Sequence, residues 1–181
     1  MTLSNPSCLA PRFCAAGRVT KLFCAATLSL AAVGNAYAVD VGTAAPELEL
    51  FTASGQKLDV ITRGKLVYVD FWASWCGPCK QSFPWMNEMQ TKYAARGLQV
   101  VAINLDQKSA DAQKFLSAVP AKFLVGFDPK GITPKAYGVK IMPTSFLIDR
   151  NGKLLKQHNG FAQDDSGALE RQIQQALESK P

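Results

Sequence analysis

The sequence has a single histidine, only five cysteines and no repeated or low-complexity tract among its 181 residues. Five cysteines are too few for a small domain that depends on a dense set of disulfides. The hydrophobic fraction of 48% is high enough for a packed core, which excludes a disordered or fibrous chain. The length is that of one domain, with at most a short appendage.

Acidic residues are missing from residues 1–38, where three basic residues occur, the last of them Lys21. An apolar run from Leu22 to Val33 follows, and it is too short to span a bilayer comfortably. The small-residue pattern Ala-Tyr-Ala at 36–38 is typical of a signal-peptidase site. We therefore predict a cleaved secretory signal peptide over residues 1–38 and one domain over residues 39–181. The alternative is an uncleaved membrane anchor that holds the domain on the periplasmic side.

The signal segment accounts for half of the formal net charge of +6, because the 17 basic and 14 acidic residues that remain give +3. The remainder has no basic cluster and no nucleic-acid-binding motif, so we predict no nucleic-acid partner. Cys8, Cys14 and Cys24 belong to the signal segment. The exported domain keeps Cys76 and Cys79, and it would work in the periplasm, an oxidising compartment.

The order of strand and helix patterns after residue 38 predicts an α/β fold. A dense β-branched and aromatic run at 65–72, a helical pattern at 76–96 and an apolar run at 98–105 form a β-α-β unit. Such a unit implies that its two strands are parallel neighbours in a sheet. Further strands are expected at 47–51, 123–126, 144–149 and 153–158, and further helices at 109–119, 132–137 and 165–178.

The residues with the most specific chemistry form the sequence Trp75-Cys76-Gly77-Pro78-Cys79-Lys80, where the 65–72 strand gives way to a helix. Two cysteines three residues apart on a first helical turn lie within disulfide reach. The first sulfur meets unpaired backbone N–H groups and the positive end of the helix dipole, which favour the thiolate. In such motifs the thiol pKa falls from about 8.5 to roughly 3.5–7.5. Pro78 fits the helix start because its missing N–H would have no partner there. We expect Cys76 to be the nucleophile and Cys79 the resolving thiol.

Metal and haem interpretations of this motif lack further ligands. A zinc site needs about four ligands, and residues 39–181 offer Cys76, Cys79 and His158 as the soft ones. Haem attachment needs a histidine directly after the second cysteine, where this chain has Lys80. An iron–sulfur cluster needs more thiolates. We therefore predict a redox-active disulfide with no cofactor and no metal.

Two further positions are candidates for the same site. Asp70 stands in the strand before Cys76, where burial without a partner would raise the pKa of its carboxyl. Such a group could deprotonate Cys79 through water, whereas a solvated aspartate at a strand end would have no role. Met142-Pro143 precedes another predicted strand. A cis proline there would expose backbone groups to a substrate peptide, although the spacing alone favours a trans bond.

The run from Val69 to Lys80, Val-Asp-Phe-Trp-Ala-Ser-Trp-Cys-Gly-Pro-Cys-Lys, resembles the signature of the thioredoxin superfamily. Pro84 and Met142-Pro143-Thr144 match its helix proline and its cis-proline loop. The signal sequence, Phe83-Pro84 and the extra segment after residue 105 are similar to exported TlpA/ResA-type thiol–disulfide oxidoreductases. The resemblance implies a thioredoxin fold, with a central mixed β-sheet flanked by helices, an N-terminal β extension and a central insertion.

The resemblance also implies the make-up of the active site. Cys76, Cys79, Asp70 and Pro143 would be the catalytic residues, with Pro143 in cis. Four neighbours would pack around them: Trp75, Gly77, Pro78 and Met142.

Three positions depart from the family pattern. Asp70 stands where the subgroup often has asparagine, and Ser82 stands where it often has glutamate. Ala102 occupies the position at which thioredoxin places a lysine near its buried aspartate. The cis-proline loop also differs from the Gly-Ala-Pro-Glu of the cytochrome-c-maturation branch, so a dedicated role in haem-protein assembly has no support.

The leading functional expectation is a periplasmic enzyme that reduces protein disulfides. The Gly-Pro pair between the cysteines resembles reducing members of the superfamily. The resemblance implies a membrane electron donor of the DsbD/CcdA type, and we expect a monomer. The alternatives are a net disulfide oxidant or isomerase, a copper chaperone or redox-gated binding module that uses His158, and a thiol peroxidase.

Overall fold

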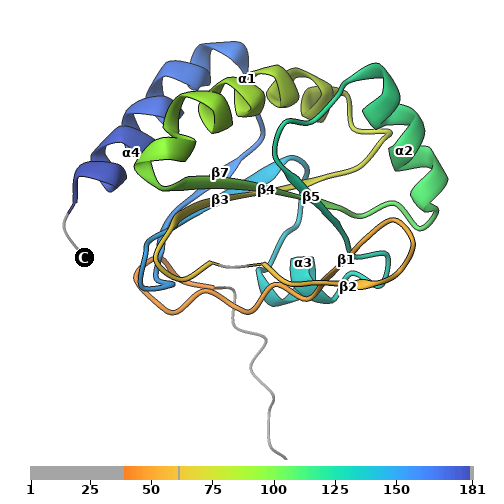
Figure 1. Cartoon of the computed structure of the whole chain (residues 1–181), viewed down its shortest axis with the longest axis horizontal. Helices are drawn as coiled ribbons and strands as arrows, with labels where there is room; N and C mark the ends of the chain where they lie inside the picture. The colour runs from red at the N-terminus through yellow and green to blue at the C-terminus, as the bar shows by residue number, and fades with distance from the viewer. Residues whose placement is uncertain (1–38, 61, 180–181) are drawn as a thin grey trace, which may run out of the picture. The chain divides into compact units, whose positions relative to one another are not determined.

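Residues 39–60 and 62–179, the part of the chain that the computed structural model describes, contain one mixed sheet with the strand order β2-β1-β5-β4-β3-β6-β7 (Figure 1). β4 is parallel to β3 and β5, and the other neighbouring pairs are antiparallel. The predicted signal peptide, with Cys8, Cys14 and Cys24, lies outside the described residues. The strands are β1 (Leu50–Phe51), β2 (Lys57–Leu58), β3 (Leu66–Trp72), β4 (Leu98–Asn104), β5 (Leu124–Phe127), β6 (Thr144–Ile148) and β7 (Leu154–Asn159).

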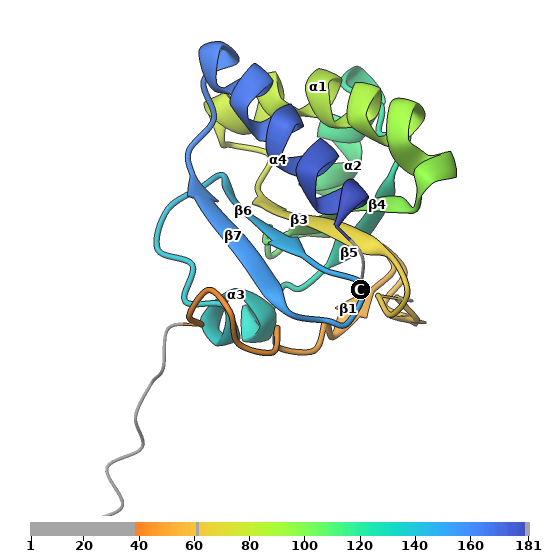
Figure 2. The same ribbon diagram turned by 90° about the vertical axis from the view of Figure 1, so that its left-hand side faces the viewer.

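Helices cover both faces of the sheet. One face carries α1, α2 and α4, and the other carries α3 and the segment that leads into β1 (Figures 1 and 2). This arrangement confirms the thioredoxin-type α/β fold expected from the sequence. No helix in the described residues has the length and apolar character needed to cross a bilayer. The helices are α1 (Gly77–Tyr93), α2 (Ser109–Ala118), α3 (Ile132–Ala136) and α4 (Ser166–Glu178), with 3-10 turns at Ala94–Arg96 and Gln163–Asp165.

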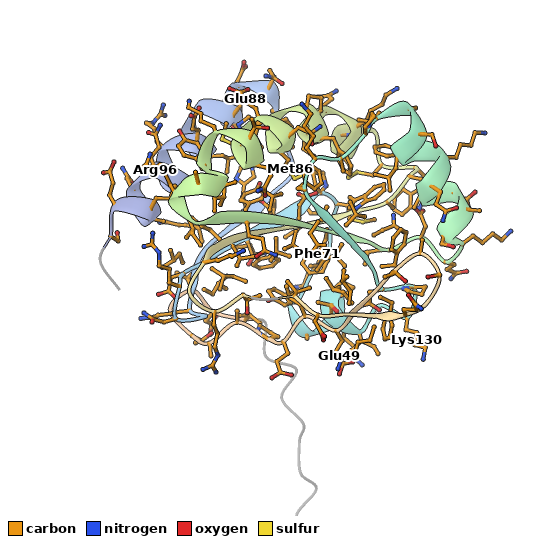
Figure 3. The ribbon with its side chains drawn as sticks, in the orientation of Figure 1. Glu49, Phe71, Met86, Glu88, Arg96 and Lys130 are labelled. Atoms are coloured by element: carbon orange, nitrogen blue, oxygen red, sulfur yellow. A yellow bond between two sulfur atoms is a disulfide. The ribbon has the colours of Figure 1, made fainter. Side chains whose placement is uncertain are left out.

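Every residue of β3 is buried, because both faces of this central strand are covered. Val67, Val69 and Phe71 pack in the cluster on the α3 side, while Tyr68 and Trp72 belong to the cluster under the other helices. Met86 of α1 and Phe71 mark these two apolar layers in Figure 3. Since successive strand side chains alternate between faces, Asp70 faces the same side as Tyr68 and Trp72.

α1 follows the sequence prediction closely. Four apolar residues on one face of this helix are buried: Phe83, Met86, Met89 and Tyr93. Gly97 ends the helical segment in a left-handed conformation with φ 98°, which glycine adopts without steric cost.

The N-terminal strand is shorter than predicted, because only Leu50–Phe51 of the expected 47–51 pairs in the sheet. The carbonyl of Pro46 instead accepts a hydrogen bond of 2.8 Å from the hydroxyl of Tyr137, just after α3. Gly126 of β5 makes room for Leu50, since a Cβ at that position would lie 2.6 Å from Cδ1 of Leu50. The extension is therefore fixed by side-chain contacts more than by strand pairing.

Candidate active site

Cys76 and Cys79 form a disulfide at the beginning of α1, with 5.3 Å between their Cα atoms. Cys76 is the N-cap residue, and its Sγ accepts a hydrogen bond of 3.3 Å from the backbone N–H of Cys79. Pro78 occupies the first turn. The sulfur of Cys76 thus meets one of the N–H groups that the start of a helix leaves without a backbone partner.

The two cysteines differ in their access to solvent. Cys79 is fully buried, whereas Cys76 is 5% exposed and lines a groove of about 210 Å³ together with Trp75, Gly77 and Lys80. Trp75 itself is 73% exposed. Of the two sulfur-bearing residues, Cys76 is thus the one that borders a groove open to the surface.

Trp75 also lines a second groove, of about 610 Å³. Its lining includes the apolar side chains of Ile141 and Met142 and two lysines, Lys135 and Lys140, and no acidic residue. The Met142–Pro143 bond is cis, as the family resemblance implied. Because Trp75 lines both grooves, Cys76 and the residues just before Pro143 border adjoining parts of the surface. The sequence did not assign the two lysines to this surface, because Lys135 lies in α3 and Lys140 follows that helix, far along the chain from the cysteines.

Asp70 is 2% exposed, and its Oδ2 is buried without a hydrogen-bond partner in the described structure. Burial raises the pKa of this carboxyl well above its usual value. Its neighbours across the sheet are Ala102 on β4 and Ser145 on β6. This location excludes the solvated strand-end alternative. Cys79 belongs to the same buried cluster as Tyr68 and Trp72, the residues on either side of Asp70 along this face.

An unanticipated polar contact holds the loop before Cys76. Asp106 accepts hydrogen bonds from the backbone N–H of Ser74 at 2.9 Å, from the Ser74 hydroxyl at 3.0 Å and from the side-chain amide of Asn104 at 2.8 Å. The carboxylate is thereby fixed at the end of β4. The signal that could have located this contact is a pair of polar residues, Asn104 and Asp106, at the end of a buried strand.

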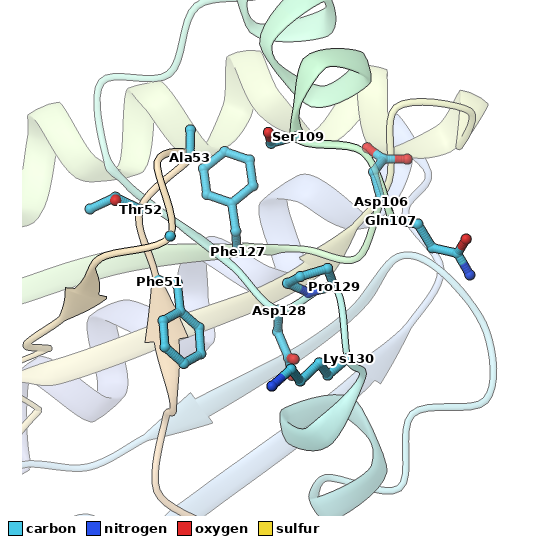
Figure 4. Close-up of a pocket in the computed structure, with 11 residues that line it drawn as sticks. Phe51, Thr52, Ala53, Asp106, Gln107, Ser109, Phe127, Asp128, Pro129 and Lys130 are labelled. Atoms are coloured by element: carbon cyan, nitrogen blue, oxygen red, sulfur yellow. The ribbon is translucent and has the colours of Figure 1, made fainter.

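A separate cavity of about 300 Å³ lies near the ends of β4 and β5 (Figure 4). Asp106 and Asp128 line it, but both are engaged elsewhere, Asp106 with Ser74 and Asp128 with the backbone N–H of Thr133 at 2.6 Å. No cysteine lines this cavity. The sulfur chemistry therefore belongs to the grooves beside Trp75.

The site combines three features: a disulfide that caps the helix after a central strand, a buried carboxyl in that strand and a cis proline nearby. Together they define the thioredoxin superfamily. The model of the Redoxin family matches residues 40–173. The thiol-disulfide oxidoreductase ResA of Bacillus subtilis (strain 168) is 30% identical over 151 residues, covering 82% of this chain and 84% of that protein. ResA of Bacillus thuringiensis subsp. konkukian is 35% identical over 123 residues, covering 67% of this chain and 71% of that protein.

Among solved structures, a Chlorobium tepidum protein provisionally assigned as the thiol:disulfide interchange protein DsbE matches with a TM-score of 0.72 and 61% identity. The match covers 77% of this chain and 99% of that one. The chain therefore belongs to the Redoxin family, as a TlpA/ResA-like member of the thioredoxin superfamily. A thioredoxin-like oxidoreductase activity follows from this membership.

Proposed function

We propose that this protein reduces disulfide bonds of other proteins in the periplasm, with Cys76 as the nucleophile and Cys79 as the resolving thiol. The observation that carries the proposal is the N-cap position of Cys76, whose sulfur accepts the backbone N–H of Cys79. In the reduced protein the same N–H and the helix dipole would stabilise a Cys76 thiolate.

The reaction takes place in two displacements. The Cys76 thiolate attacks one sulfur of the substrate disulfide, which forms a mixed disulfide and releases the other substrate sulfur as a thiolate. Cys79 then loses its proton and attacks the sulfur of Cys76, which releases the second substrate thiolate and leaves the Cys76–Cys79 disulfide. The two departing thiolates take up one proton from solvent and one that originates from Cys79.

Asp70 is the base that we assign to the second displacement. Cys79 is fully buried, so solvent hydroxide has little access to its thiol. A carboxyl with a raised pKa on the same face of the sheet is suited to accept that proton, through an intervening water. In its charged form Asp70 has no partner for Oδ2, which makes the carboxylate a stronger base.

The substrate is expected to bind as an extended segment across the surface that Trp75 divides. Trp75 and Ile141 are large apolar side chains that are 73% and 54% exposed, which is unusual unless a partner covers them. The cis Met142–Pro143 loop offers its backbone to such a segment. Lys135 and Lys140 in the groove favour acidic residues beside the substrate cysteine.

The cellular setting is part of the same proposal. The predicted signal peptide at 1–38 would export the domain 39–181, and the oxidised disulfide would be reduced again by a membrane donor of the DsbD/CcdA type. We expect the protein to act as a monomer.

Trapping tests the assignment of the two thiols. Cys79→Ala should accumulate a mixed disulfide between Cys76 and an oxidised protein substrate, visible as a mass increase that dithiothreitol reverses. Cys76→Ala is the matched control and should accumulate none. Equal trapping by both variants, or trapping by neither, would rule out these roles.

The direction of electron flow is tested by the reduction potential. Equilibration of the protein with dithiothreitol buffers should give a value near that of thioredoxin, about −270 mV. A value near that of the strong oxidant DsbA, about −120 mV, would establish a net oxidant instead.

A further inference from the structure

Three polar residues form a row across the sheet that begins at Asp70. In the strand register Asp70 of β3 lies opposite Ser145 of β6, and Ser145 lies opposite His158 of β7. Directly opposed residues of antiparallel strands project to the same face with their Cβ atoms about 4.5–5.5 Å apart. Asp70 and Ser145 are 2% and 3% exposed, and the His158 side chain is 31% exposed. The row therefore leads from the buried carboxyl to the surface of the protein.

Space for water lies along this row. A cavity of about 10 Å³ is lined by Tyr68, Ser145 and His158 together with Gln172 of α4. A volume of this size is about the minimum that holds one water molecule. The Nε2 atom of His158 is buried without a hydrogen-bond partner in the described structure, as is Oδ2 of Asp70. Because Ser145 and His158 both line this cavity, a water molecule in it could bridge the Ser145 hydroxyl to Nε2 of His158.

We propose that Ser145 and His158 form a proton exit for Asp70, an inference that rests on the proposed reductase mechanism. Before Cys79 attacks, the protonated Asp70 carboxyl passes its proton along the Ser145 hydroxyl and an intervening water to His158, which releases it to solvent. The Asp70 carboxylate can then accept the proton of Cys79, and that proton later leaves by the same route. No electron moves in this relay, and one proton enters and leaves it per turnover.

The charged and titratable groups around the row are compatible with this direction. Tyr68 lies beside Asp70 on β3, and burial together with the Asp70 charge raises the pKa of its hydroxyl, so it stays a neutral donor. Asp165, before α4, has its Oδ2 3.8 Å from Nε2 of His158, at the end of the row that reaches the surface. Lys156 of β7 lines the same small cavity. On the side of α1, Cys76 and Cys79 belong to the same buried cluster as Tyr68 and Trp72, which flank Asp70 on its face of β3.

The chromogenic disulfide 5,5′-dithiobis(2-nitrobenzoate) separates the two displacements with the reduced protein. Attack by Cys76 releases one coloured thiolate, and attack by Cys79 releases the second. The leaving thiolate needs no proton, so the second phase depends on removal of the proton from Cys79. Stopped-flow traces between about pH 5.5 and 8.5 cover the range in which histidine changes its charge.

His158→Gln and Ser145→Ala should slow the second phase on the order of tenfold and leave the first phase unchanged. Asp70→Asn, which removes the base itself, should slow the second phase roughly 10²-fold or more. Added imidazole should rescue His158→Gln, since that side chain reaches the surface, and should not rescue Ser145→Ala. Gln157→Ala is the matched control, because this exposed side chain neighbours His158 but lies on the opposite face of β7, and it should behave as the unaltered protein. Circular dichroism of each variant verifies folding.

The single histidine of the sequence supplies an independent measurement. Its imidazole proton resonances need no assignment among several histidines, and their pH titration should show a second inflection caused by Asp70. That inflection should vanish in Asp70→Asn. Two outcomes would overturn the relay. One is an identical, single inflection in both proteins. The other is that both relay variants have second-phase rates within about twofold of the unaltered protein at every pH. Loss of the first phase from the unaltered protein would instead refute the proposed function, and the relay with it.

Discussion

Replacement of Asp70 by asparagine tests whether a buried carboxyl without a partner reduces stability at neutral pH. The unfolded chain loses the Asp70 proton near pH 3.9, as an ordinary aspartate does. The folded chain keeps that proton to a higher pH, because burial raises the pKa of the carboxyl. Within this window the folded state binds more protons than the unfolded state. The free energy of unfolding must therefore decrease as the pH rises.

The magnitude follows from the linkage relation. Stability that is fully present below about pH 3.9 is lost at about 1.4 kcal/mol per pH unit, until the pH passes the raised pKa of Asp70. Two pH units within that window correspond to about 2.7 kcal/mol. Asp70→Asn cannot ionise, so its stability relative to the unaltered protein should increase by the same amount as the pH rises.

Urea unfolding of the oxidised proteins, at pH values from about 4 to 8, measures this difference. Asp106→Asn is the matched control, because Asp106 is 6% exposed but accepts three hydrogen bonds. Its replacement places an amide against donors and should cost about 1–3 kcal/mol at neutral pH. If the difference between Asp70→Asn and the unaltered protein stays constant with pH, the carboxyl does not keep its proton and the reasoning is refuted.

Two further variants, one single and one double, test the packing and the surface charge. Gly126→Ala should destabilise the protein by about 1–3 kcal/mol in urea unfolding, because the added Cβ would lie 2.6 Å from a side-chain atom of β1. Lys135→Glu with Lys140→Glu should raise the KM for a peptide disulfide with acidic flanks several-fold and lower it for one with basic flanks, while the reaction with a small uncharged disulfide is unchanged.

Each of these has its own control. Gly167→Ala in α4 meets no atom closer than 3.5 Å and should not reduce stability. Equal losses at both glycines would contradict the packing argument. Lys114→Glu, on the exposed surface of α2, should leave both peptide KM values unchanged, and high salt should diminish the effect of the paired lysine variant. If the double variant still has a lower KM for the peptide with acidic flanks, the two lysines do not select the substrate.

The parts of this molecule that depend on local patterns could be predicted from the sequence. β3 and α1 follow from a dense apolar run, the cysteine pair and the stop at Gly97, and the burial of Asp70 follows from its place in that strand. The contacts that the sequence did not indicate depend on strand register. Ser145 lies opposite Asp70, and His158 lies opposite Ser145, only because β6 and β7 pair beside β3 in one particular alignment.

The same limit explains the N-terminal extension. An alternating pattern indicates a strand over 47–51, but its length depends on what lies opposite it. β5 pairs with β1 at a single position. Before β1, the hydroxyls of Thr133 in α3 and of Tyr137 just after it donate hydrogen bonds to backbone carbonyls of the extension. The position of Lys135 and Lys140 likewise depends on the fold, since they line a groove with Trp75 although they are 60 and more residues from it in the chain.

The short N-terminal strands also bear on how the protein stays apart from its copies. Without β1 and β2, β5 would present an open row of backbone donors and acceptors, which is a template for association with another chain. Leu50, seated against Gly126, keeps β1 in place over that edge. The outer strand β2 has only two residues and begins with Lys57, so the new edge is short and charged. Thus the extension leaves the sheet with an edge that offers little backbone for association with another chain.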